Sequence, residues 1–280
     1  MSDRWFQIRE HFFSLADQPD DKVNLGNGAL LIAGVEYPRL DTAVYQSRLD
    51  QLAERLQRRC DPRITAADIA GRMTGILVEE EGFHGNRQNY YDPDNSCLNR
   101  VLDRRTGIPV SLSLVYIETG RRAGLSMQGI ALPGHFIAAL FHETGSVYID
   151  AFNGGALLTE EECRQRARLA DKEAGVIQYD GLIPESNKAI LKRMLRNLKA
   201  IYHDLGHLLK ELEMVQWILR LTPDAAEELR ESGLLYEALG HSRQAIADFE
   251  HYLDAAPMAP DRAMIEGKII ALRNTPHWLH

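Results

Sequence analysis

The sequence predicts an α+β domain followed by a region made of helices alone. Three observations carry this prediction. Apolar residues recur at helical spacing up to about residue 85, three short strand-like segments follow between residues 127 and 150, and a helical-hairpin pattern then repeats every 34 residues. Helices followed by consecutive antiparallel strands are typical of an α+β domain. We expect a first domain over 1–185, helical to residue 85 with a core over 86–185, and a second over 186–280.

Composition limits the kinds of partner. The 280 residues carry a net charge of −8, which argues against nucleic acid or an anionic membrane as a partner, because both require a basic face. The longest apolar run, residues 28–35, is far too short to cross a bilayer, and residues 1–7 do not resemble a secretory signal. The three cysteines are widely separated without a CxxC pair, which is typical of reduced thiols and predicts a cytoplasmic protein.

The first 85 residues are expected to be helices. Apolar residues follow Asp41 at spacings of three and four, and Thr65 with Asp68 three residues later is a capping-box pattern. The acidic run Glu79–Glu81 is interpreted as a solvated helix end. No motif predicts a metal or a cofactor: the acidic residues near 92–96 lack the glycine and the final glutamate of a calcium loop.

The core that follows alternates helix and strand signals. A turn-rich segment begins at Gly82, and a Gly-Ile-Pro turn at residues 107–109 separates two helical stretches. Thr159 and Glu162 form a second capping-box pattern, which predicts one more helix. The predicted elements between these signals are helices Cys97–Asp103 and Ser111–Ala123 and strands Met127–Leu132, His135–Phe141 and Ser146–Asp150.

A possible reactive pair comes from the second and third strands. If residues 142–145 connect the two strands, the numbers of opposite residues add up to 287. Asp150 then lies opposite Ile137 and shares a sheet face with His135. An imidazole beside a carboxylate, with the helix start at Ser111 preceding them, is the outline of a nucleophile–His–Asp site. A shorter loop or a bulge would place the two side chains on opposite faces.

The helical region contains two copies of one hairpin unit. Three residue types recur 34 residues apart, and each suits one position of a helix–turn–helix unit: a tyrosine between the helices, a glycine where the first helix ends, and a proline after the second. This spacing resembles the tetratricopeptide repeat. The first copy departs from the pattern at Glu211, where a small residue is expected. The pairs are Tyr202 and Tyr236, Gly206 and Gly240, and Pro223 and Pro257.

Three ordered motifs extend the resemblance to most of the chain. They are the block from Asn95 to Ser113, the run Leu132–Phe136 with its Pro-Gly-His, and the run Ile149–Gly155 with its Ile-Asp. Together they resemble the bacterial SirB-type family, in which a transglutaminase-like core precedes tetratricopeptide repeats. The resemblance implies a papain-like, transglutaminase-related fold, with His135 and Asp150 at the family's histidine and aspartate positions.

The nucleophile position departs from active transglutaminases, which carry a cysteine at the start of the helix before the histidine strand. Residues 109–113 contain none. Ser111 is then either a helix N-cap or a substitute nucleophile, which would need His135 as a base and oxyanion donors. Cys97 is the nearest thiol, but it lies in an apolar helical pattern that suits a buried residue.

We therefore expect a non-catalytic protein that acts as a binding or regulatory module for a protein or peptide partner. The alternative is an acyl-transfer or amide-hydrolysing enzyme that uses Ser111, His135 and Asp150; a purely structural adaptor is a third possibility. Two repeats are fewer than a free-standing array needs, so we expect them to dock on the chain's own first domain. The candidate binding residues are Asn95, Asn99 and Asn153.

Overall fold

The computed structural model describes residues 3–60, 64–174 and 181–274. The chain divides into two compact units, residues 1–194 and 195–280. The division falls inside one long helix, α8 (Asn187–Asp204), later than the boundary predicted from the turn-rich segment before it. Each unit is described on its own below.

Helices form the first part of unit 1, as the apolar periodicity predicts. The two expected N-terminal caps are present: Asp41 accepts from the amide of Ala43, and Thr65 and Asp68 form a reciprocal capping box. The last of these helices continues into a π-helical turn before the chain reverses at Gly82. The elements are α1 (Asp3–Ala16), η1 (Asp20–Lys22), α2 (Leu25–Gly34), α3 (Thr42–Arg59), α4 (Ala66–Thr74) and η2 (Gly75–Glu80).

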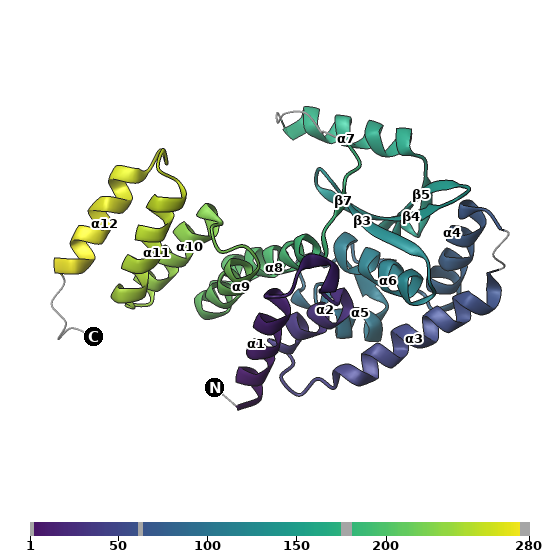
Figure 1. Cartoon of the computed structure of the whole chain (residues 1–280), viewed down its shortest axis with the longest axis horizontal. Coiled ribbons are helices and arrows are strands. Elements are labelled where there is room, and N and C mark those ends of the chain that lie inside the picture. The colour runs from purple at the N-terminus through teal and green to yellow at the C-terminus, as the bar shows by residue number, and fades with distance from the viewer. Residues whose placement is uncertain (1–2, 61–63, 175–180, 275–280) are drawn as a thin grey trace. The chain divides into compact units, whose positions relative to one another are not determined.

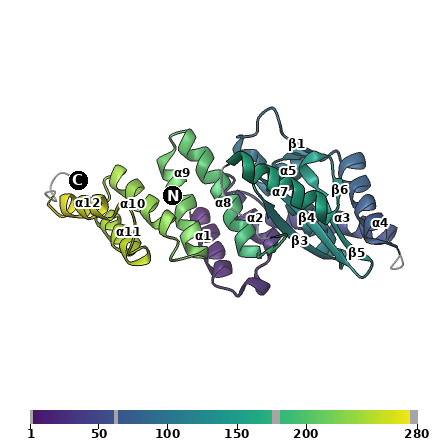
Figure 2. The same ribbon diagram turned by 90° about the horizontal axis from the view of Figure 1, so that it is seen from above.

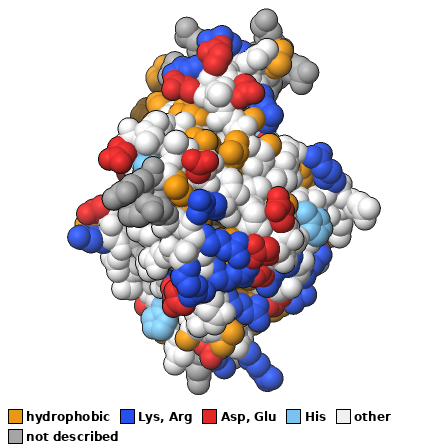
Figure 3. Space-filling model, turned by 90° about the vertical axis from the view of Figure 1, so that its right-hand side faces the viewer, with side chains coloured by type: hydrophobic (Ala, Val, Ile, Leu, Met, Phe, Trp, Pro, Cys, Tyr) orange, Lys and Arg blue, Asp and Glu red, His pale blue; other side chains and the backbone are white. Residues whose placement is uncertain are grey.

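The acidic run at the end of η2 is not simply solvated. Glu80 pairs with Arg55 and Arg59 of α3, and Glu81 pairs with Arg55 and with Arg105, the latter at 2.8 Å. These contacts join α3 to η2 and to the loop after α5. On the side of the domain that carries α3 and α4, Figure 3 shows basic side chains gathered against acidic ones rather than a purely basic face.

An antiparallel five-stranded sheet, in the order β6-β5-β4-β3-β7, is the centre of the rest of unit 1. Helix α6 lies beneath one face and α7 lies across the other (Figures 1 and 2). The α7 face buries Ile130, Ile137 and Tyr148 against Cys163 and Ala167. The bounds are β1 (His84–Gly85), η3 (Pro93–Asn95), α5 (Leu98–Arg104), β2 (Thr106–Gly107), α6 (Pro109–Arg122), β3 (Ser126–Leu132), β4 (His135–His142), β5 (Gly145–Asp150), η4 (Ala151–Asn153), β6 (Ala156–Leu158), α7 (Glu160–Ala174) and β7 (Pro184–Glu185).

The predicted hairpin register is confirmed. Phe141 pairs with Ser146 and Ala138 with Ile149, so that opposite residues of β4 and β5 sum to 287. The three expected strands are present, and β6 and β7 add an edge strand on each side. Loop residues 84–85 also pair in parallel with residues 106–107, which holds the turn-rich segment against the start of α6.

The two predicted hairpins are present, and they lie in unit 2 except for the start of α8. Each first helix ends at a glycine with positive φ, 68° at Gly206 and 77° at Gly240. The amide after each glycine donates to the carbonyl of the tyrosine five residues earlier, at 2.9 Å in the first copy and 2.8 Å in the second. Pro223 and Pro257 follow the second helices. The bounds are α9 (Leu208–Leu221), α10 (Ala226–Ala238), α11 (Ser242–Ala255) and a further helix, α12 (Arg262–Asn274).

Candidate functional site

His135 and Asp150 meet where the central hairpin brings the start of β4 beside the end of β5. The His135 Nε2 atom lies 2.8 Å from Asp150 Oδ1. The carboxylate is fully buried, whereas the imidazole keeps 21% of its side-chain surface exposed. The juxtaposition therefore follows from the predicted register, and the histidine is the member of the pair that solvent or a ligand can reach.

The Asp150 carboxylate is hydrogen-bonded on both oxygens. Besides His135, Oδ1 accepts from the amide of Asn153 at 3.2 Å, and Oδ2 accepts from Asn153 Nδ2 and from Arg166 of α7, both at 2.8 Å. Burial alone would raise the pKa of Asp150, but the hydrogen bonds from His135 and Asn153 outweigh burial and lower it to about 2. Asp150 is thus an anion at neutral pH, fully satisfied by its neighbours.

His135 is held on two further sides. Arg193 donates to its backbone carbonyl at 3.0 Å, and the ring of Phe152 meets the imidazole edge to face at a centroid distance of 6.3 Å. Because Nε2 donates to Asp150, the neutral ring presents Nδ1 as a hydrogen-bond acceptor. The pair is therefore arranged to accept a proton at Nδ1 from any acidic group placed beside it.

Ser111 is enclosed and its hydroxyl is already engaged. The helix starts at Pro109 instead of Ser111, so Ser111 is the third helical residue and not the N-cap. Its Oγ donates to the carbonyl of Asn95 at 2.6 Å and accepts from the amide of the N-cap residue Ile108 at 3.1 Å. The side chain has no exposed surface. The hydroxyl fixes the helix start and the neighbouring loop.

The turn-rich loop before α5 is organised by Asn95. Its side-chain amide donates to the carbonyls of Asn89 and Tyr90, at 2.7 and 3.1 Å, and its oxygen accepts from Asn86. Asn95 is fully buried. Its side-chain atoms are engaged by the loop itself, and contact with a ligand stays a prediction.

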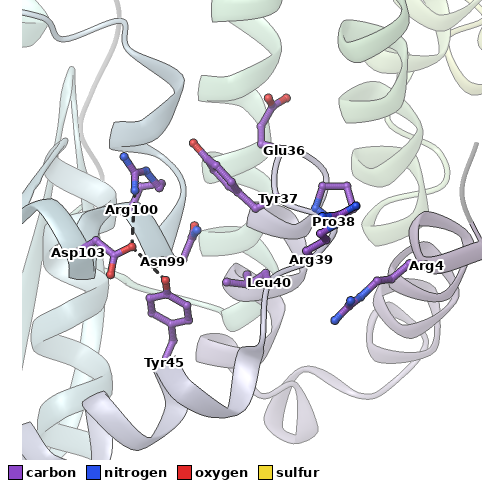
Figure 4. Close-up of a pocket in the computed structure, with 10 residues that line it drawn as sticks. All are labelled: Arg4, Glu36, Tyr37, Pro38, Arg39, Leu40, Tyr45, Asn99, Arg100 and Asp103. Carbon is purple, nitrogen blue, oxygen red and sulfur yellow. Dashed lines mark hydrogen bonds and ion pairs between the residues drawn. The ribbon is translucent and has the colours of Figure 1, made fainter.

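The other two predicted binding residues lie in different places. Asn153 is exposed at the end of β5 and positions Asp150. Asn99 instead lines a groove of about 720 Å³ at the start of α5, together with Tyr37, Leu40 and Tyr45 (Figure 4). Neither His135 nor Asp150 lines that groove. The three asparagines therefore do not form one pocket.

The three free cysteines are poor nucleophiles. Burial raises the pKa of the Cys97 thiol, and burial likewise raises the pKa of Cys163, to about 11. The pKa of Cys60 is also raised by burial. Cys97 and Cys163 are buried, as the interpretation of Cys97 as an apolar filler predicts. Across the described residues, no cluster of three His, Cys, Asp or Glu side chains could hold a metal ion.

Sequence reasoning missed the arginines around the pair. Arg166 reaches Asp150 from α7, Arg193 reaches the His135 carbonyl from α8, and Arg87 donates to the side-chain oxygen of Asn153. Each is a single charged residue on a helix or loop, a pattern that normally indicates a solvated surface. The helices that carry Arg166 and Arg193 could be predicted, from a capping box and from the repeat pattern, but the contacts of these side chains could not.

Comparisons with known proteins agree with this architecture. Residues 43–196 match the transglutaminase-like superfamily and residues 198–268 match the tetratricopeptide repeat. A UPF0162 protein of Xylella fastidiosa is 35% identical over 266 residues, which cover 93% of this chain and 94% of that protein. Protein SirB1 of Salmonella typhimurium is 24% identical over 272 residues, covering 95% and 99%. No solved structure matches.

A eukaryotic protein shares part of the chain. The human F-box only protein 21 is 30% identical over 187 residues, which cover 62% of this chain and 28% of the human protein.

Within the described part of the chain, none of the helices is long and apolar enough to cross a membrane.

Proposed function

This chain belongs to the SirB-type family of transglutaminase-like proteins with tetratricopeptide repeats, and from this premise we propose that it is a non-catalytic member that acts as a binding or regulatory module. The observation that carries the proposal is that the hydroxyl of Ser111 is buried and already hydrogen-bonded. At the helix start where active transglutaminases hold a cysteine, this chain has a serine whose hydroxyl is enclosed and bonded to Asn95 and Ile108.

A serine in this position lacks what acyl transfer requires. A hydroxyl ionises far less readily than a thiol, so it needs a general base in direct contact. The hydroxyl of Ser111 instead donates its hydrogen bond to the backbone carbonyl of Asn95 at 2.6 Å. The nearest thiol in sequence, Cys97, is buried and has a raised pKa, and it is therefore protonated at neutral pH.

The His135–Asp150 pair has a structural role in this proposal. The pair, with Asn153 and Arg166, ties β4, β5, η4 and α7 together at one end of the sheet. The same geometry also keeps the enzyme alternative open, because a base with an available Nδ1 is present. The alternative is an acyl-transfer or amide-hydrolysing enzyme in which Ser111 attacks and Asp150 orients His135.

Chemical labelling separates the two functions. The full-length protein is treated with a fluorophosphonate probe, which reacts with activated serines, and with an amine donor plus a glutamyl peptide. We expect neither labelling nor amine incorporation, with an active serine hydrolase and an active transglutaminase as positive controls. Labelling that Ser111→Ala abolishes would establish the enzyme and refute the proposal.

The partner in this proposal is a protein or peptide held by the repeats, since tetratricopeptide repeats generally mediate protein–protein interaction. Docking of the repeats on the first domain stays a prediction. Limited proteolysis of the full chain between residues 181 and 195 would test it, by showing whether the two halves separate after cleavage.

The three free cysteines, without a disulfide, support a reducing compartment such as the cytoplasm.

A further inference from the structure

A charged hollow of about 430 Å³, here called the repeat hollow, lies between the first and the second repeat. It lies among α8, α9 and α10, and all of its residues belong to unit 2. Leu208, Leu234 and Leu235 give it an apolar part. The charged and titratable residues that line it are Lys199, His203, Glu211, Glu227, Arg230 and Glu231.

Glu211 is the unusual member of the repeat hollow. Its side chain is only 2% exposed, and one oxygen, Oε1, meets His203 Nδ1 at 2.9 Å. The second oxygen, Oε2, is buried and has no hydrogen-bond partner in the described part of the chain. A buried carboxylate oxygen without a donor is costly, by several kcal/mol for an unpaired ion. Such an oxygen indicates a missing partner, which is a water, an N–H group or a cation.

The second repeat shows that packing does not require this glutamate. Ala245 lies 34 residues after Glu211, at the equivalent place, and is fully buried. An alanine therefore suffices to bring the helices of the hairpin together. The carboxylate of the first copy is an addition to the packing surface, and its use must be sought in the hollow.

The remaining charges leave the repeat hollow negative. Lys199 is engaged by Glu231, and Arg230 is engaged by Asp261 outside the hollow. Glu227 makes no ion pair with the described residues, and Glu211 has one oxygen left over. The unmatched groups are both acidic, so the complementary ligand is a cation.

His203 contacts Glu211 through an exposed side chain that can change its rotamer. Its side chain is 71% exposed, and Glu211 is the partner of its ring. A turn of this exposed side chain about its χ1 angle frees Oε1 of Glu211 without moving the helices. A longer cation then replaces the imidazole.

We propose that Glu211 anchors a lysine or arginine side chain of the protein partner in the repeat hollow, with its aliphatic stem against Leu234 and Leu235 and with His203 displaced. This inference rests on the proposed binding role of the repeats and names the chemistry of their partner. A lysine ammonium supplies three donors and an arginine guanidinium a planar pair, and either can satisfy Oε1 and Oε2 together.

The test uses the full-length protein and two fluorescein-labelled, end-blocked heptapeptide libraries. One library has a central lysine and the other a central norleucine, which keeps the stem and lacks the charge. All other positions are mixtures of Ala, Ser, Gly and Leu. We expect fluorescence polarisation to show binding of the lysine library at least about tenfold tighter. The His203 ring resonances should shift on saturation with the lysine library alone.

Three variants complete the experiment. Glu211→Gln and Glu211→Ala should remove the preference for lysine, and Ala245 in the equivalent position indicates that Glu211→Ala folds. Asp254→Asn removes one exposed charge outside the hollow and should keep the preference. Equal binding of both libraries, or a preference that survives Glu211→Ala, refutes the anchor but leaves a binding role for the repeats. If neither library binds, the anchor and the peptide-binding role are both wrong.

Discussion

Replacing Asp150 by asparagine tests the network that holds the His135 site together. The side chain keeps its shape but loses its charge, and it presents one acceptor and one NH2 donor in place of two acceptors. Each oxygen of Asp150 now accepts two hydrogen bonds, from His135 and the Asn153 amide on one side and from Asn153 Nδ2 and Arg166 on the other. Whichever way the new amide turns, its NH2 group faces two donors.

The size of the effect follows from this count. His135 can relieve one conflict by changing tautomer, but the backbone amide of Asn153 and the guanidinium of Arg166 cannot. Each buried donor left without an acceptor costs about 1–3 kcal/mol. The contribution of Arg166 is discounted because its side chain is 47% exposed. We expect Asp150→Asn to lower the free energy of unfolding by about 2–4 kcal/mol at pH 7.

The pH dependence gives a second reading of the same network. The pKa of Asp150 is about 2 in the folded protein, below its value of about 3.9 in an unfolded chain. A depressed pKa contributes stability that is fully present above about pH 4 and is lost as the pH falls towards 2, in total about 2 kcal/mol. The asparagine variant lacks this contribution, so the stability difference should narrow as the pH falls from 5 to 3.

Urea unfolding followed by circular dichroism measures both effects, with Asp254→Asn as the control for removal of an exposed carboxylate. The control should stay within about 0.5 kcal/mol of the parent. If Asp150→Asn also stays within that margin at pH 7, or if its deficit is the same at pH 3 and pH 5, the network does not stabilise the domain as argued.

Three other substitutions test separate features. Glu211→Ala should increase the free energy of unfolding by about 1 kcal/mol and so raise the melting temperature, because it removes a buried oxygen without a partner. A lower melting temperature by calorimetry would contradict this. Ser111→Ala should cost about 1–3 kcal/mol in urea unfolding, since the Asn95 carbonyl and the Ile108 amide lose their partner, and an unchanged midpoint would argue against the enclosed hydroxyl. Gly155→Ala should destabilise by more than about 1 kcal/mol, because φ is 71° and the new Cβ would lie 2.5 Å from Tyr116 Oη and 2.6 Å from Thr74 Oγ1; full stability in thermal melts would refute the close approach.

The central hairpin and the repeats were predictable because their signals are local. A four-residue connection fixes the parity of the register, and parity alone decides that His135 and Asp150 share a face. The repeat glycines were predictable for a similar reason, since ending a helix in the left-handed region requires a residue without a Cβ. Both Gly206 and Gly240 adopt positive φ.

Other features of the fold could not be predicted, because no local sequence pattern indicates them. Strand β7 consists of two residues, Pro184 and Glu185, too few for an alternating pattern, and its pairing with β3 depends on the tertiary fold. Helix α6 starts two residues before the predicted position, because the Gly-Ile-Pro sequence predicts a turn although proline is also favoured at the first position of a helix. Besides His135, the hydrogen-bond donors to Asp150 come from η4 (Asn153) and from α7 (Arg166). A sequence does not show which helix covers which face of a sheet.

Asp150 and Glu211 are two of the buried carboxylates of this chain, and they show how the surroundings of a charged group separate a structural role from a binding role. Asp150 accepts four hydrogen bonds from its own chain, so no ligand is required to keep it ionised in the interior. Glu211 is almost as buried but has a single partner, an exposed imidazole, and one oxygen with none among the described residues. Because an unpaired buried charge is costly and the equivalent position tolerates alanine, packing alone does not account for Glu211. In the proposed function, Asp150 therefore has the structural role, and Glu211, the residue that departs from the repeat pattern, is the candidate for recognition of a partner.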